Sequence, residues 1–81
     1  MIPIARPIIS QKEINSVIRV LKSGHLVAGE NVKKFEENFS EYNEVKYAIT
    51  TSNGTTALHT ALLATGIKPD DEVITTPFSF N

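Results

Sequence analysis

Apolar residues recur at helical spacing near the start of the chain. After an extended stretch at residues 1–9, the pattern predicts a helix over residues 10–23. Ser10 and Glu13 stand three residues apart at its start, which predicts a capping box. Gly24 suits the left-handed conformation that ends many helices. The apolar face of this helix consists of Ile14, Val17, Ile18 and Leu21.

Two further stretches have the same periodicity. Residues 30–42 predict a helix that buries Val32, Phe35, Phe39 and Tyr42, and we expect Asn43 to end it with a positive φ angle. Residues 55–64 predict a third helix, closed by Gly66. Its inward positions would be Ala57, Leu58, Ala61 and Leu62.

Two short apolar runs are typical of buried strands. Residues 47–51 and 72–76 predict parallel strands, one before and one after the third helix in the chain. The order strand, glycine turn, helix, turn, strand indicates an α/β fold with a parallel sheet. Two strands form no stable sheet in water, and they cannot cover three amphipathic helices. The sequence therefore predicts an incomplete sheet.

Composition narrows the class of protein. Lys and Arg total 8 against 9 Asp and Glu, so no basic surplus indicates a nucleic-acid or membrane partner. No apolar run approaches the roughly 18 residues that span a bilayer. Pro3 and Pro7 interrupt the segment where a signal peptide would need an apolar helix. The chain has no cysteine, which fits a reducing compartment, and we expect a cytoplasmic protein.

Residues 50–58 carry the clearest chemical signal. A predicted strand runs through one glycine, Gly54, directly into a predicted helix, whose first N–H groups would have no partner within the helix. Such an end attracts phosphate, and Thr55 and Thr56 add hydroxyl donors. The alternative is ordinary capping, in which Ser52 or Asn53 closes the helix start and no ligand is bound.

Aromatic residues follow the second predicted strand, where ligands of open α/β sheets lie. From the residues alone, Phe80 either stacks on a flat ring or fills a core, and Phe78 fits a core better. His25 and His59 lack the spacing of metal ligands, so no metal site is expected. The acidic residues are scattered and give no acid–base pair.

Taken in order, six short motifs resemble the DegT/StrS-type family of pyridoxal-phosphate-dependent nucleotide-sugar aminotransferases. The resemblance covers nearly the whole chain. Its motifs are Ile4-Ala-Arg-Pro7 with Glu13, Leu21-Lys-Ser-Gly24, Gly29-Glu-Asn-Val32 with Phe35-Glu36, Tyr47-Ala48, Ser52-Asn-Gly-Thr-Thr-Ala-Leu58, and Asp71-Glu-Val-Ile74 with Thr76-Pro-Phe-Ser-Phe80.

The resemblance implies the N-terminal portion of the large domain of a fold type I aminotransferase. Such enzymes act in polysaccharide biosynthesis and pass an amino group, usually from glutamate, to a keto-sugar carried on a nucleotide. Gly54, Thr55 and Thr56 would hold the phosphate of pyridoxal phosphate, and Phe80 would stack on its ring. The implied partners are the nucleotide-sugar substrate, the amino-acid donor and a second subunit in a homodimer.

The same resemblance places the Schiff-base lysine beyond Asn81, and Lys46 and Lys68 do not stand where it would. Residues 1–81 are thus expected to be an N-terminal fragment of the cofactor-binding domain, with no catalytic residue and no activity alone. In the implied fold the two predicted strands are not neighbours, so the chain should lack its own sheet. Two alternatives stay open: a fragment of a sugar dehydratase that uses the same cofactor, and a small non-catalytic binding or dimerisation module.

Overall fold

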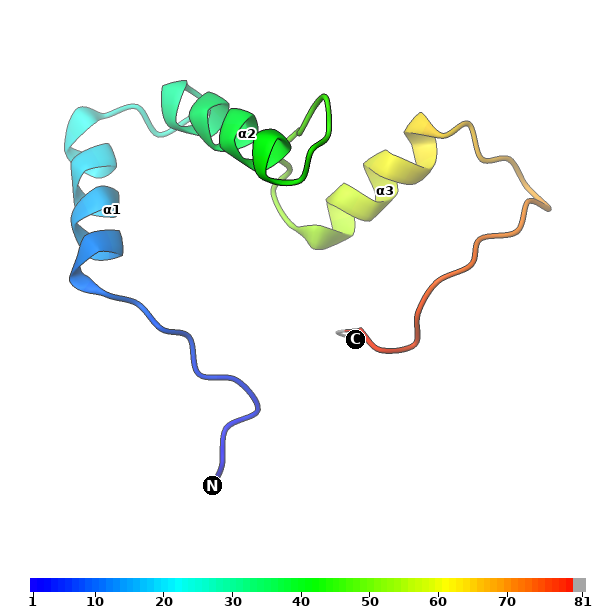
Figure 1. Cartoon of the computed structure of the whole chain (residues 1–81), viewed down its shortest axis with the longest axis horizontal. Helices are drawn as coiled ribbons and strands as arrows, with labels where there is room; N and C mark the ends of the chain where they lie inside the picture. The colour runs from blue at the N-terminus through cyan, green and yellow to red at the C-terminus, as the bar shows by residue number, and fades with distance from the viewer. Residues whose placement is uncertain (80–81) are drawn as a thin grey trace. The chain divides into compact units, whose positions relative to one another are not determined.

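The computed structural model describes residues 1–79 and contains three helices, α1 (Gln11–Ser23), α2 (Glu30–Tyr42) and α3 (Gly54–Ala64). Figure 1 draws each of them as a coiled ribbon, with no strand arrow along the described chain. The chain divides into two units, residues 1–48 with α1 and α2, and residues from Ile49 onward with α3.

Polar groups at both ends define α1. The Glu13 carboxylate accepts hydrogen bonds from the backbone N–H of Ser10, at 2.8 Å, and from the Ser10 hydroxyl. This confirms the predicted capping box. At the other end Gly24 has φ 75° and donates its N–H to the Leu21 carbonyl oxygen at 3.2 Å, as predicted for a left-handed closing residue.

α2 has the predicted bounds, but its end differs from the prediction. Asn43 has φ −91°, and the positive φ of 54° falls on Glu44 instead. The Glu44 N–H donates to the Glu41 carbonyl oxygen at 3.1 Å, and the Val45 N–H donates to the Ser40 carbonyl oxygen at 3.0 Å. This is the Schellman pattern of a helix end. Asn43 contributes differently, because its side-chain amide donates to the Phe39 carbonyl oxygen at 2.9 Å.

α3 begins one residue before the prediction, at Gly54, and Gly66 follows it with φ 75°. The predicted turn after it is confirmed. The Asp71 carboxylate accepts the Lys68 N–H at 2.8 Å, and Asp70 has a positive φ of 73°.

The two predicted strands do not form in the part of the chain that the structure describes. Residues 47–51 and 72–76 have no regular secondary structure. A strand forms only when a neighbouring strand exchanges backbone hydrogen bonds with it, and neither segment is part of such a ladder in residues 1–79. The prediction of strands at these positions is therefore wrong for residues 1–79 of this chain.

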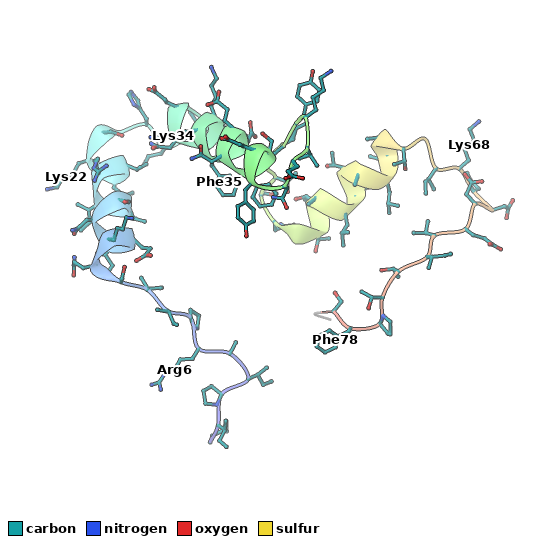
Figure 2. All side chains as sticks on the ribbon, viewed as in Figure 1. Arg6, Lys22, Lys34, Phe35, Lys68 and Phe78 are labelled. Carbon is teal, nitrogen blue, oxygen red and sulfur yellow. The ribbon has the colours of Figure 1, made fainter. Side chains whose placement is uncertain are left out.

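No residue among those described is buried, so the predicted core positions do not come together in a core. On α1, Ile14 is 43% exposed, and on α2, Phe35 is 55% and Phe39 50% exposed. Phe35 and Phe39 stack along α2 with ring centroids 5.7 Å apart, the spacing of an i, i+4 pair. Figure 2 shows the Phe35 side chain as a stick on the ribbon of α2. The helices thus present apolar faces without a core between them.

Acidification is expected to weaken α1. The hydrogen bond from the Ser10 hydroxyl, with backbone N–H groups of Glu13 and Ser10, lowers the pKa of the Glu13 carboxyl. Because the pKa is lower in the helix than in the unfolded chain, the bond stabilises α1 above the unfolded-state pKa and is lost as pH falls through the lowered value. The Cα chemical shifts of α1 should move toward coil values as the pH falls below the ordinary glutamate pKa of about 4.3 and through the lowered value in the helix.

Glu13→Gln is the matched control for this pH dependence. Glutamine keeps an oxygen acceptor for the Ser10 N–H but does not titrate. It should leave α1 helical at neutral pH and abolish the acid-induced change. An equal change in the variant would show that the capping box does not govern the acid response of α1.

Candidate functional site

The start of α3 is organised by one reciprocal pair of residues, Asn53 and Thr56. Asn53 is the N-cap in an extended conformation, and its side-chain oxygen Oδ1 accepts the Thr56 N–H at 2.9 Å. The Thr56 hydroxyl oxygen Oγ1 in turn accepts the Asn53 N–H at 3.3 Å. These two bonds form a capping box in which threonine takes the place of the usual glutamate or glutamine.

Neighbouring hydroxyls tie the preceding turn to this box. Thr51 donates its hydroxyl to the Asn53 carbonyl oxygen at 2.9 Å, and the Thr56 hydroxyl reaches the same oxygen at 2.9 Å. Ser52 Oγ lies 3.2 Å from Thr56 Oγ1. Of the two capping residues considered from the sequence, Asn53 is the one that closes the helix. The turn is held by side chains on its own backbone.

Two N–H groups stay open at this helix start. Gly54 and Thr55 provide the first two amides of α3, and neither makes a hydrogen bond in the part of the chain that the structure describes. The Thr55 hydroxyl also has no partner among the described residues. The first turn contains no acidic side chain that would occupy or repel an anion there. Open amides and the helix dipole together make this end suitable for a phosphate group.

Gly54 leaves room above these amides. A Cβ placed on it would meet nothing within 4 Å. The described chain itself therefore does not require glycine at this position, whereas a phosphate that approaches the backbone closely would require it. Of the three residues expected to hold phosphate, the structure leaves Gly54 and Thr55 open and engages Thr56 in the cap.

The expected ring-stacking residue, Phe80, lies outside the described residues. Phe78, expected in a core, is 94% exposed, and Figure 2 shows its ring beside the C-terminal segment. Its N–H donates to the Thr76 hydroxyl at 3.1 Å.

The remaining candidates form no second site. Among the described residues, no group of His, Asp and Glu side chains is placed to hold a metal ion. Lys46 lies with its Nζ atom 5.6 Å from the centroid of the Tyr47 ring, on an exposed loop. A shallow groove that the sequence did not predict runs beside this loop, and its mixed charges indicate no particular ligand. It is lined by Lys33, Glu36, Glu37, Ser40, Lys46, Tyr47 and Ala48.

None of the helices in residues 1–79 combines the length and the apolar character that crossing a membrane requires.

Comparison with known proteins gives a consistent result along nearly the whole chain. The model of the DegT/DnrJ/EryC1/StrS aminotransferase family matches residues 7–81. An uncharacterized protein of Methanocaldococcus jannaschii is 47% identical over 79 residues, which are 98% of this chain and 20% of that protein. The spore coat polysaccharide biosynthesis protein SpsC of Bacillus subtilis is 41% identical over 80 residues, which are 99% of this chain and 21% of SpsC.

A third relative, the GDP-perosamine synthase of Escherichia coli, is 49% identical over 74 residues, which are 90% of this chain and 20% of the synthase. The chain thus spans about a fifth of the length of these relatives. No solved structure matches it significantly. Below, the term family-length protein means a protein as long as these relatives that contains these 81 residues as the segment that matches them.

Replacing Gly54 should separate a ligand site from a simple helix cap. A Cβ at Gly54 meets nothing within 4 Å in the described chain, so we expect the start of α3 to persist in Gly54→Ala and Gly54→Val. In the family-length protein, Gly54→Val should weaken binding of pyridoxal phosphate by about 1.5–3 kcal/mol, the worth of one hydrogen bond to a charged group. The valine side chain would hold the phosphate away from the amides. Removal of the Thr56 hydroxyl should weaken binding less.

The measurement is a titration of the cofactor-free protein with pyridoxal phosphate, followed by absorbance. Gly54→Ala serves as the milder variant, and its affinity for pyridoxal phosphate should lie between that of the wild type and that of Gly54→Val. Equal affinity of Gly54→Val and wild type would mean that this turn is a helix cap without a bound phosphate.

Proposed function

Because the chain belongs to the DegT/DnrJ/EryC1/StrS aminotransferase family, we propose that it serves as the N-terminal part of a pyridoxal-phosphate-dependent nucleotide-sugar aminotransferase. The enzyme would transfer an amino group from glutamate to a keto-sugar carried on a nucleotide. The names of two relatives, a polysaccharide biosynthesis protein and a GDP-perosamine synthase, support a role in sugar metabolism.

The observation that carries the proposal is the pair of open amides at Gly54 and Thr55, inside the segment that the family model matches. The absence of an acidic side chain in the first turn of α3 and the open space at Gly54 both fit a phosphate. When bound, pyridoxal phosphate supplies the electron sink for amino transfer, and the protein supplies position and electrostatics.

The part of this chain in that reaction is to hold and orient. Gly54, Thr55 and Thr56 would fix the cofactor phosphate at the start of α3, and Phe80 would stack on the pyridine ring. Residues 50–58 contain no ionisable side chain, so they would bind phosphate through neutral donors only. Proton transfer must therefore come from residues elsewhere in the family-length protein.

The remaining assignments follow from the proposed reaction. We expect the family-length protein to be a homodimer in the cytoplasm, with glutamate as its amino donor. We expect residues 1–81 alone to transfer no amino group. A self-contained binding module is disfavoured, because the described residues bury no apolar side chain and so form no core.

Transfer of labelled nitrogen tests the proposed function. The family-length protein, loaded with pyridoxal phosphate, is mixed with nitrogen-labelled glutamate and a panel of nucleotide-linked keto-sugars, and the products are weighed by mass spectrometry. We expect 2-oxoglutarate and one labelled amino-sugar nucleotide, with each product absent when the cofactor is left out. The isolated 81-residue chain is the matched negative control.

Two results would contradict the proposal. One is a sugar product that has lost water but gained no labelled nitrogen, which indicates a dehydratase. The other is a family-length protein that binds no pyridoxal phosphate.

A further inference from the structure

Two adjacent threonines at the start of α3 differ in their hydrogen bonding. Thr55 has an open N–H and an open hydroxyl in the part of the chain that the structure describes. Thr56 has neither, because its N–H is held by Asn53 Oδ1 at 2.9 Å and its hydroxyl hydrogen by the Asn53 carbonyl oxygen at 2.9 Å. The sequence alone gives these two residues the same donors.

This difference decides which groups can receive an anion without a rearrangement. A phosphate oxygen can approach the amides of Gly54 and Thr55 directly. To reach the Thr56 amide it would have to displace the Asn53 side chain, which also holds the first turn of the helix. Breaking that bond gives up the capping hydrogen bond at the start of α3, so displacement is unfavourable.

We propose that Asn53 is a positioning residue: it commits the Thr56 amide to the cap, so that the cofactor phosphate is bound by the amides of Gly54 and Thr55 and by the Thr55 hydroxyl. The inference rests on the proposed function, and it narrows the expected phosphate-binding residues at the start of α3 to Gly54 and Thr55. Thr56 then acts through Asn53 and does not contact the phosphate.

The reciprocal bonds make Asn53 and Thr56 one unit. Removing either side chain opens the same box, since each side chain holds the backbone N–H of the other. The loss should therefore occur once, whichever partner is removed. An independent phosphate ligand would behave differently, because its loss would add to that of Asn53.

The experiment is a double-mutant cycle in the family-length protein, with cofactor-free protein titrated with pyridoxal phosphate and, separately, with pyridoxal, which lacks the phosphate. Asn53→Ala and Thr56→Val should each weaken pyridoxal phosphate binding roughly fivefold, the equivalent of one lost helix cap. The double variant should be no weaker than the weaker single variant. Pyridoxal affinity should stay unchanged throughout.

Two further variants act as controls. Asn53→Ser keeps a capping oxygen for the Thr56 N–H, so it should restore most of the affinity for pyridoxal phosphate. Thr55→Val removes a proposed ligand outside the box, and its loss should multiply with that of Asn53→Ala. Circular dichroism of each variant checks that the protein is folded.

Three results would overturn the role of Asn53. Asn53→Ala could bind pyridoxal phosphate more tightly than the wild type, or the losses of the two single variants could multiply in the Asn53→Ala/Thr56→Val double variant. The third is a loss of affinity for pyridoxal as large as the loss for pyridoxal phosphate. Tighter binding would mean that the phosphate uses the Thr56 amide and that Asn53 only competes for it. If the unsubstituted protein binds no pyridoxal phosphate at all, the proposed function fails with it. If the unsubstituted protein binds but the losses multiply, only the role of Asn53 fails.

Discussion

Hydrogen bonds between side chains and the exposed backbone groups of helix ends hold the described structure in place. Each helix leaves its first N–H groups and last carbonyls without internal partners. At the start of α1 the Glu13 carboxylate accepts the Ser10 N–H, and at the start of α3 the Asn53 side chain accepts the Thr56 N–H. With no buried apolar side chain among the described residues, these local bonds set where α1 and α3 begin.

The same local chemistry explains which predictions from the sequence were right. Caps, glycines and apolar periodicity act within a few residues, so they predicted the ends of α1 and α2 and placed α3 within one residue. The prediction that Asn43 ends α2 with a positive φ was wrong, because Asn43 and Glu44 are both able to follow a helix. Only the backbone path places Glu44 in the left-handed region, where asparagine is the commoner residue.

Residues 47–51 and 72–76 were predicted as strands because their composition fits a pleated, buried surface, but composition does not supply a partner strand. The candidate site was predictable in part for a similar reason. The glycine before α3 and its two threonines are visible in the sequence. The unequal bonding of Thr55 and Thr56 depends on where the Asn53 side chain points, which the sequence does not specify.

These observations lead to one account of the chain: local hydrogen bonds set the starts of α1 and α3, and we expect residues 47–51 and 72–76 to pair only with further residues of a family-length protein. Amide hydrogen exchange tests this most directly. The amides of residues 47–51 and 72–76 are compared in the 81-residue chain and in the family-length protein under the same conditions. The account predicts rapid exchange in the chain alone and strong protection in the family-length protein. Protection of both segments in the isolated chain would contradict it.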